Sequence, residues 1–327
     1  MTVVVTGASG HIGSNLVRLL IERGRTVRAV DVRPGPSLAG LDLEYVEADV
    51  LDSESLLRAF AGVDVVFHLA ARISIAGDPD GRVWATNVMG VRNAAETALR
   101  TGVRRFVHCS SVHAFDLAAA RGSAVDETSP PAIRPGLPVY DRSKAAGESE
   151  LRAVVARGLD AVVVNPTGVT GPCDFEPSRM GRFFRALRQR RLPALVEGGF
   201  DWVDVRDVAL ALAGAADRGR TGEGYLVPGH RASTRELAVL AHEVAGVPVP
   251  RPTVPLALAR AWARAASVVA APTLSSLFTV ESLHALASDP HVNGRRAELE
   301  LGHRPRPLSD TIGDLYRWFD DPSDAHG

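Results

Sequence analysis

The stretch VVVTGASGHIG, residues 3–13, decides the fold class of this 327-residue chain. A short β-branched run leads into a glycine loop, and the loop opens the helix-like segment HIGSNLVRLLIERG, residues 11–24. Gly7, Gly10 and Gly13 allow a tight turn, close approach of backbone amides to a pyrophosphate, and packing of helix on strand. The spacing is G-x-x-G-x-x-G rather than G-x-G-x-x-G. In this strand–turn–helix context it predicts a dinucleotide site with the phosphates at the helix N-terminus.

The same alternation of strand and helix continues through the first half of the chain. Strands that are apolar on both faces and alternate with amphipathic helices predict a parallel sheet covered on both sides. The sequence therefore predicts an α/β fold with a doubly wound, Rossmann-type sheet. The further strands are expected at TVRAVD (26–31), LEYVEAD (43–49), VDVVFHLAA (63–71), RRFVHCSS (104–111) and DAVVVNP (160–166), and the further helices at 53–62, 83–102 and 139–158.

After Pro166 the pattern changes to loops rich in glycine and proline, followed by short helical segments. We predict a smaller, mostly helical C-terminal lobe for the substrate, and a helix over 205–219 that returns to the first domain. The helices of the lobe are expected at 179–191, 235–246, 255–271 and 309–319. The predicted division gives residues 1–165 and about 200–220 to the NAD(P)-binding domain, 166–199 and 221–320 to the lobe, and 321–327 to a flexible tail.

The composition of the chain argues against nucleic acid and membrane partners. Hydrophobic residues make up 46% and charged residues 23%, as in an ordinary globular protein, and a net charge of −1 gives no electrostatic case for nucleic acid. Two cysteines make no disulfide framework, and the N-terminus shows no signal-peptide pattern, so we expect a cytoplasmic protein. The most apolar stretch, residues 255–272, is interrupted by two arginines and is too short for a bilayer span, so no membrane partner is expected.

Acidic side chains suggest the type of dinucleotide. Asp31 ends the second predicted strand, where a carboxylate can accept hydrogen bonds from the adenosine ribose hydroxyls. This favours NAD, because a 2′-phosphate would meet a like charge. Arg28 and Arg33 are near enough in sequence to serve a 2′-phosphate, so NADP stays open. Asp49 follows the third predicted strand and is either an adenine contact or an ordinary loop acid.

The chain contains a single lysine, Lys144, although lysine and arginine together number 37. Arginine cannot replace lysine where a compact point charge must tune a neighbour's pKa. Tyr140 lies four residues earlier, on the same face of a predicted helix. An adjacent ammonium would lower the pKa of a tyrosine toward the range useful for acid–base catalysis. Ser111 is at the C-terminal end of the fifth predicted strand and can donate a hydrogen bond to a substrate oxygen at the same edge of the sheet.

Taken together, these motifs resemble the extended short-chain dehydrogenase/reductase superfamily, the NAD-dependent epimerase/dehydratase family. The resemblance covers essentially the whole chain. It rests on the glycine loop and Asp31, and on HLAA (68–71), the serine pair at 110–111, YDRSK (140–144), VNPTGVTGP (164–172) and WVDVRDVA (202–209).

The resemblance implies roles for particular residues. Tyr140 would be the catalytic acid–base, Lys144 its helper and Ser111 the group that orients the substrate. Asn87 matches a position that supports the site, where a structural role and a catalytic role are both open. A small-molecule substrate and a homodimer are implied, and no metal is expected. The cofactor contacts expected from motif and resemblance are Gly7, Ser9, Gly10, His11, Ile12, Gly13, Asp31, Arg33, Asp49, Val50, Leu69, Ala70, Ala71, Asn87, Tyr140, Lys144, Pro166, Thr167 and Val169.

Two departures from the family pattern point to a branch. Many sugar-nucleotide members carry V-Y-G after the serines, whereas here CSSVHAFD (109–116) places His113 in that loop. Phe200 stands where such members usually carry a diphosphate-binding arginine. The stretch EGGFDWVDVRDVA (197–209) and residues 294–319 look more like the dihydroflavonol-4-reductase-like and 3β-hydroxysteroid-dehydrogenase-like branch. Members of that branch tend to take flat hydrophobic alcohols or ketones. Ser111, His113 and Phe175 are candidate substrate contacts.

Three functions are therefore weighed. The first is an NAD(P)-dependent oxidoreductase that interconverts a secondary alcohol and a ketone on a hydrophobic small molecule such as a steroid, flavonoid or aryl ketone. The second is a sugar-nucleotide 4-epimerase or dehydratase with tightly bound NAD. The third is a dinucleotide-sensing protein without catalysis. The set Ser111, Tyr140 and Lys144 counts against the third, because binding alone requires no proton-transfer group.

Overall fold

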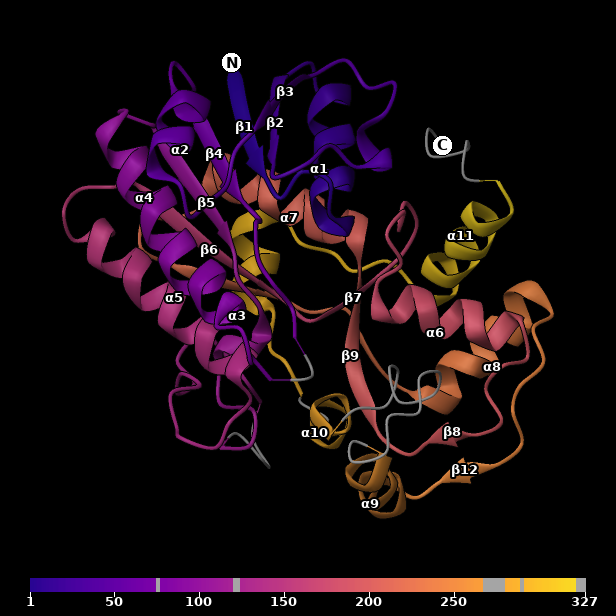
Figure 1. Ribbon diagram of the computed structural model, residues 1–327. Coiled ribbons are helices and arrows are strands. Elements are labelled where there is room, and N and C mark those ends of the chain that lie inside the picture. Colours follow the sequence, from indigo (N-terminus) through magenta and orange to yellow (C-terminus); the bar gives the residue numbers. More distant parts are fainter. Residues whose placement is uncertain (75–76, 120–123, 267–279, 289–290, 322–327) are drawn as a thin grey trace.

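A seven-stranded parallel sheet forms the centre of the molecule (Figure 1). The computed structural model describes residues 1–74, 77–119, 124–266, 280–288 and 291–321. The strand order, β10-β6-β5-β4-β1-β2-β3, steps outward from β1 in both directions, which confirms the predicted doubly wound α/β fold. The strands are β1 (Thr2–Thr6), β2 (Thr26–Asp31), β3 (Glu44–Glu47), β4 (Val65–His68), β5 (Arg105–Cys109), β6 (Ala161–Pro166) and β10 (Gly224–Val227).

Helices cover both faces of this sheet. On one face α1 (His11–Glu22) packs beside α7 (Val205–Arg218), the helix expected over residues 205–219. On the other face lie α2 (Ser53–Phe60), α4 (Gly90–Arg100) and α5 (Val139–Val155). Each face has its own cluster of buried valine, alanine, leucine and phenylalanine side chains, as strands that are apolar on both sides require.

The predicted helix over residues 83–102 contains a π-helical turn. A short helical turn, α3 (Arg82–Trp84), leads into the π segment Ala85–Met89, which leads in turn into α4. The helices here approach closely, since a Cβ added at Gly147 of α5 would lie 2.2 Å from the Asn87 carbonyl oxygen. The π turn thus places Asn87 against α5, and π turns are frequent at functional sites.

The second lobe combines helices with short strands that the sequence did not predict. A three-stranded sheet, β11-β9-β7, joins β7 (Gly168–Thr170), β9 (Gly199–Asp204) and β11 (His230–Ser233), and β8 (Leu195–Val196) pairs with β12 (Thr253–Val254). The helices are α6 (Arg179–Arg188), α8 (Thr234–Ala245), α9 (Leu256–Ala266), α10 (Val280–Ser288) and α11 (Leu308–Asp320). Within the described residues, no helix has the length and apolar character needed to cross a bilayer.

The division of the chain between sheet and lobe differs from the predicted boundaries. Residues 224–227, which the prediction placed in the lobe, form β10 and pair with β6 in the central sheet. Ala297 and Leu301 likewise pack in the core between the sheet and α7. We therefore propose that the Rossmann unit also includes residues around 224–227 and 297–301. Most of the predicted tail, 322–327, and the end of the apolar stretch, 267–272, lie outside the described residues.

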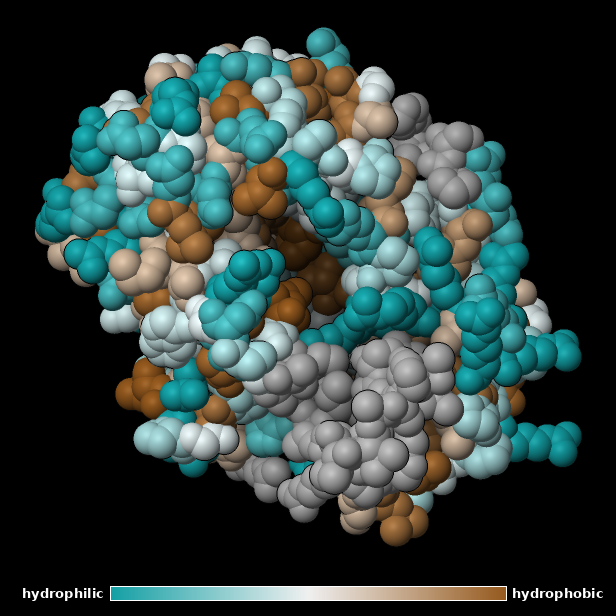
Figure 2. All heavy atoms as spheres, viewed as in Figure 1, coloured by the Kyte–Doolittle hydropathy of each residue, from teal (hydrophilic) through white to brown (hydrophobic). Residues whose placement is uncertain are grey.

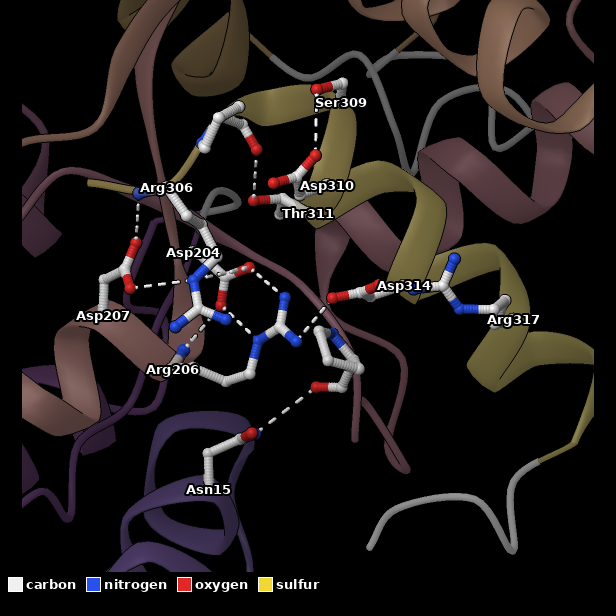
Figure 3. A network of polar contacts seen from close by, with 12 residues as sticks. Asn15, Asp204, Arg206, Asp207, Arg306, Ser309, Asp310, Thr311, Asp314 and Arg317 are labelled. Carbon is white, nitrogen blue, oxygen red and sulfur yellow. Dashed lines mark hydrogen bonds and ion pairs between the residues drawn. The ribbon is translucent and has the colours of Figure 1, made fainter. Parts of the chain in front are cut away.

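A network of charged side chains ties α11 and the segment before it to β9 and α7 (Figure 3). Arg206 makes a bidentate contact with the fully buried Asp204, at 3.0 and 2.7 Å, and reaches Asp314 of α11 at 2.6 Å. Arg306 contacts Asp207 at 2.9 Å. Burial would raise the pKa of Asp204, but Arg206 and Arg306 hold it below its usual value. This stabilisation is present at neutral pH and is lost as the pH falls through that lowered value.

We expect Arg206→Met to destabilise the protein by about 3 kcal/mol, because it leaves the buried Asp204 carboxylate without its main partner. Urea unfolding measures the change. Arg188→Met is the matched control, since Arg188 and Asp320 are 42% and 62% exposed and such pairs contribute at most about 1 kcal/mol. Equal losses in the two variants would contradict the structural role of the network.

Candidate active site

The glycine loop at the end of β1 leaves no room for side chains. Gly7 has a φ of +67°, and a Cβ there would lie 2.8 Å from the Ala70 amide nitrogen. A Cβ on Gly13 would lie 2.2 Å from the Gly7 carbonyl oxygen. Gly10 is the N-cap of α1 and supplies no side-chain cap, so the first amides of the helix lack a partner within it. This geometry fits a bound pyrophosphate.

Asp31 lies beside the glycine loop at the end of β2. Its Oδ2 atom accepts a hydrogen bond from the Ser9 amide at 3.0 Å, and its Oδ1 atom accepts one from the Val32 amide at 2.9 Å. Each carboxylate oxygen keeps a further lone pair, which leaves capacity for ribose hydroxyl donors. The side chain is thus held against the glycine loop by two backbone amides.

The two arginines near Asp31 differ in their availability for a 2′-phosphate. Arg28 donates from Nε to Glu44 at 2.7 Å and from Nη1 to the carbonyls of Ala59 and Ala61, so two of its three guanidinium nitrogens are engaged elsewhere. Arg33 is 76% exposed, and its ion pair with Glu176, which is 62% exposed, is 3.6 Å long. Turning toward a 2′-phosphate would therefore cost Arg33 one exposed ion pair, whereas it would cost Arg28 three hydrogen bonds.

The loop after β4 lies against the glycine loop through Thr6. The Thr6 hydroxyl accepts hydrogen bonds from the amides of Leu69 and Ala70, each at 3.2 Å, and pairs with His68 Nδ1 at 2.9 Å. Ala71 follows in an exposed position. The HLAA motif is therefore fixed beside Gly7, as a segment that lines a dinucleotide must be.

Asp49 and Val50 have different environments. Asp49 is exposed, and its Oδ1 atom accepts a hydrogen bond from the Leu51 amide at 2.9 Å. Val50 is buried beneath Gly90 of α4, where an added Cβ would lie 2.7 Å from the valine Cγ2. Asp49 can reach a ligand at the surface, whereas the side chain of Val50 supports the packing of α4.

The three residues predicted to be catalytic come together at the carboxyl edge of the sheet. Tyr140 is in the first turn of α5, Lys144 is one turn further, and Ser111 follows β5. Lys144 is 4% exposed and donates a hydrogen bond to the Cys109 carbonyl at 3.3 Å. Ser111 is within hydrogen-bonding reach of the Tyr140 phenol and also accepts from the His113 amide at 3.2 Å. The groups needed for proton transfer therefore share one small region.

The electrostatics of Tyr140 differ from the sequence expectation. Burial raises the pKa of Tyr140, and the hydrogen bond with Ser111 and the charge of Arg179 oppose that rise only in part. Burial also lowers the pKa of Lys144, while the charge of Glu148 supports the ammonium. Among the described contacts, the Lys144 ammonium donates its hydrogen bond to the Cys109 carbonyl at 3.3 Å.

Asn87 connects the site to the loop after β4. Its amide group donates to the Arg72 carbonyl and to Ser143 Oγ, each at 2.9 Å, and its oxygen accepts from the Arg72 amide at 2.8 Å. Ser143 in turn donates to the Tyr140 carbonyl at 2.7 Å. Both donors of Asn87 are used by the protein, so the geometry favours its structural role.

Asn165 and Glu148 support the site but were not recognised in the sequence. Asn165 donates to Glu148 at 2.6 Å and to the Ser111 carbonyl at 3.1 Å. Glu148 is 4% exposed and also pairs with Arg152 at 2.9 Å. The available signal was the spacing of Glu148 four residues after Lys144 on a helix. The pair couples α5 to the backbone that carries Ser111.

The other residues predicted to contact the cofactor or the substrate lie in different parts of the structure. His11 Nε2 lies 2.9 Å from the Pro172 carbonyl, and Thr167 donates to the buried Asp201 at 2.6 Å. Phe175 lies between Arg18 and Trp318, with an edge-to-face ring distance of 5.4 Å to the tryptophan. The remaining three are Ile12 in the first turn of α1, Pro166 at the end of β6 and Val169 in β7. The described ring contacts of Phe175 do not include Tyr140 or His113.

His113 lies directly against Tyr140. Its ring meets the tyrosine edge-on at 5.7 Å and stacks flat on Phe200 at 5.7 Å with an angle of 11°. His113 Nδ1 is 3.2 Å from Asp141 Oδ1. On the face of the molecule drawn in Figure 2, the surface is hollowed near its middle, with hydrophobic residues at the bottom of the hollow.

The chain belongs to the NAD dependent epimerase/dehydratase family, whose model matches residues 3–227. It is 35% identical to sterol demethylase protein B of Methylococcus capsulatus, over 98% of both chains. It is 32% identical to a putative dihydroflavonol 4-reductase of Synechocystis, over 96% of this chain and 93% of that protein. A shorter match, over 53% of this chain and 48% of the relative, is a 34% identical 3 beta-hydroxysteroid dehydrogenase/Delta 5-->4-isomerase of Mycobacterium tuberculosis.

Solved structures agree on the fold. The crystal structure of gox2253 superposes with a TM-score of 0.84 at 32% identity, over 98% of both chains. MoeE5 in complex with UDP-glucose and NAD gives a TM-score of 0.78 at 25% identity, over 99% of this chain and all of that one. The predicted family and its branch are confirmed: the chain is an extended short-chain dehydrogenase/reductase with reductase and dehydrogenase relatives, and it is an enzyme.

Proposed function

We propose that this enzyme interconverts a secondary alcohol and a ketone on a hydrophobic small molecule, using NAD(P) and Tyr140 as the acid–base. The observation that carries the proposal is the juxtaposition of Ser111, Tyr140 and the buried Lys144 at the carboxyl edge of the sheet. That edge also holds the glycine loop and Asp31, so the proposed proton-transfer group and the proposed dinucleotide site lie at the same edge of the sheet.

The glycine loop and the start of α1 would hold the pyrophosphate, and Asp31 would hold the adenosine ribose. When bound, the nicotinamide supplies the acceptor or donor of the hydride. The loop that carries Ala70 and Ala71 would line the nicotinamide, because Thr6 fixes that loop beside Gly7.

Ser111 and Tyr140 would bind the oxygen of the reacting carbon. In the oxidative direction the Tyr140 phenolate accepts the hydroxyl proton, and in reduction the phenol returns it to the developing alkoxide. The Ser111 hydroxyl donates a hydrogen bond to the same oxygen and stabilises the charge that develops there. Because burial raises the pKa of Tyr140, the phenolate requires added positive charge, and the Lys144 ammonium, one helical turn further along α5, would supply it.

Phe200 favours an apolar substrate over a sugar nucleotide. It is 4% exposed and lies in the aromatic group with His113 and Trp202, so it offers no charge to a diphosphate. The names of the relatives, a sterol demethylase protein and a putative dihydroflavonol reductase, support the same substrate class. Likeness to MoeE5 keeps a sugar-nucleotide reaction as the competing hypothesis.

A parallel assay separates the two reactions. NADH and NADPH absorbance is followed with steroid, flavonoid and aryl ketones, while UDP- and dTDP-sugars are analysed for interconversion. Loss of reduced cofactor with a ketone supports the proposal. Sugar interconversion without net loss of reduced cofactor contradicts it and favours the epimerase.

We expect Asp31→Ala to weaken NAD binding at least about tenfold more than NADP binding, because the carboxylate accepts ribose hydroxyls and repels a 2′-phosphate. Dissociation constants for the two oxidised cofactors, measured by calorimetry, test this. Asp49→Ala is the matched control and should leave the ratio of the two constants unchanged. Equal weakening of NAD and NADP by Asp31→Ala would remove Asp31 from the ribose site.

A further inference from the structure

A histidine–aspartate pair lies beside Tyr140 and has no part in the proposed hydride transfer. His113 Nδ1 is 3.2 Å from Asp141 Oδ1, and the Asp141 side chain is only 10% exposed. The contact is within ion-pair distance, although its angle is not that of a directed hydrogen bond. A rotation about one side-chain torsion would align the angle while the two groups remain adjacent.

The ring of His113 is fixed on several sides. Phe200 covers one face at 5.7 Å, and Tyr140 meets the ring edge-on at the same distance. The His113 amide donates to Ser111 Oγ, which anchors the backbone of the histidine to the group that would orient the substrate. Such a restrained ring can present one nitrogen at a defined place beside Ser111 and Tyr140.

Asp141 decides which nitrogen carries the proton. An ionised carboxylate only accepts hydrogen bonds, so its closeness to Nδ1 is favourable only when Nδ1 bears hydrogen. In the neutral ring Nε2 then keeps its lone pair and is an acceptor. Nδ1 is completely buried while the side chain retains 21% of its surface, and no described residue hydrogen-bonds to Nε2.

The position of Asp141 works against the acid–base chemistry of its neighbour. Its negative charge adds to the rise in the pKa of Tyr140. An acid in the first turn of a helix stabilises the helix by about 0.3–1 kcal/mol when exposed, so that effect alone does not require burial beside a tyrosine. Holding His113 in a defined tautomer is a function that does require this position.

We propose that His113 Nε2 accepts a hydrogen bond from a second hydroxyl group of the substrate, close to the reacting carbon, with Asp141 as the positioning residue for the imidazole. The substrate class is then a hydroxyketone, or the matching diol, on a hydrophobic framework. This specificity rests on the proposed oxidoreductase function. It is tested by measuring binding rather than turnover, so that the role of His113 and the oxidoreductase function can be rejected independently.

The probes are α-hydroxyacetophenone and propiophenone, which differ by a hydroxyl in place of a methyl group. Their dissociation constants are measured by calorimetry with protein saturated in oxidised cofactor, where no turnover is needed. We expect the wild-type protein to bind the hydroxyketone at least about tenfold more tightly. His113→Phe keeps the stacking on Phe200 and should reduce the preference to about twofold or less.

Asp141→Asn tests the positioning role. The amide can donate to Nδ1 and so favour the opposite tautomer, and we expect the preference to fall about threefold or more while propiophenone binding is unchanged. The control is His242→Phe, the same change at an exposed position on α8, which should keep the full preference. A thermal midpoint for each variant accompanies the binding data.

Several results would overturn the proposal. They are no wild-type preference between the probes, no binding of either probe, and equal weakening of both probes by His113→Phe. Reduction of the two ketones is assayed in the same samples. A preference in binding without turnover of any ketone would keep the role of His113 and reject the oxidoreductase. Turnover of both ketones at equal efficiency, without a binding preference, would support the oxidoreductase and reject the role of His113.

Discussion

Tyr140→Phe is expected to lower kcat about a thousandfold, because the proposed carrier of the proton is lost while the shape of the side chain is kept. The phenol lies at the start of α5, within reach of Ser111, and no other described titratable group shares that hydrogen bond. Cofactor contacts expected elsewhere, at the glycine loop and Asp31, remain. The dissociation constant for the dinucleotide should therefore change by less than about threefold.

Single-turnover rates and fluorescence titration with reduced cofactor measure the two quantities for Tyr140→Phe. Tyr316→Phe is the matched control, since it removes a buried phenol oxygen that donates to the Phe184 carbonyl in the second lobe. That variant should lose some stability and keep its kcat within about twofold. A Tyr140→Phe enzyme with near-wild-type kcat would exclude tyrosine as the acid–base.

Lys144→Arg is expected to lower kcat at least about a hundredfold, although the positive charge is kept. The side chain is 4% exposed and is directed to the Cys109 carbonyl, so a longer planar guanidinium cannot occupy the same place. The charge of Glu148 would still favour a cation, and the misplaced charge would no longer stabilise a Tyr140 phenolate.

Lys144→Met separates charge from shape in the same assay. We expect it to match or exceed the loss in Lys144→Arg, because it removes the ammonium altogether and leaves Glu148 without that neighbour. A Lys144→Arg enzyme that retains wild-type kcat would show that a positive charge alone is sufficient. The single lysine would then have no special role.

The features that the sequence predicted are those set by local pattern. The glycine loop follows a β-branched run and opens an amphipathic helix, and the structure places Gly7 and Gly13 where a Cβ would collide with backbone atoms. The strands β1, β4, β5 and β6 were predicted because both of their faces are buried, which makes their sequences largely apolar runs.

The features that the sequence did not predict depend on distant parts of the chain. β7, β9 and β11 are three to six residues long, and β9 includes Asp201 and Asp204, whose burial depends on Thr167 and Arg206. His113 lies in the turn after β5 and Asp141 in the first turn of α5, and no periodicity in the sequence indicates that these two segments meet. The raised pKa of Tyr140 results from burial, which spacing alone does not reveal.

The place of β10 in the sheet has a consequence for biosynthesis. β6 ends at Pro166, but its outer neighbour begins only at Gly224, after α6 and α7 and the strands between them. During translation the outer edge of β6 therefore has no neighbouring strand until more than fifty further residues have been synthesised. Unpaired edges invite association with other chains. The nascent protein thus has an interval in which chaperone binding would protect it, and that interval ends when β10 docks.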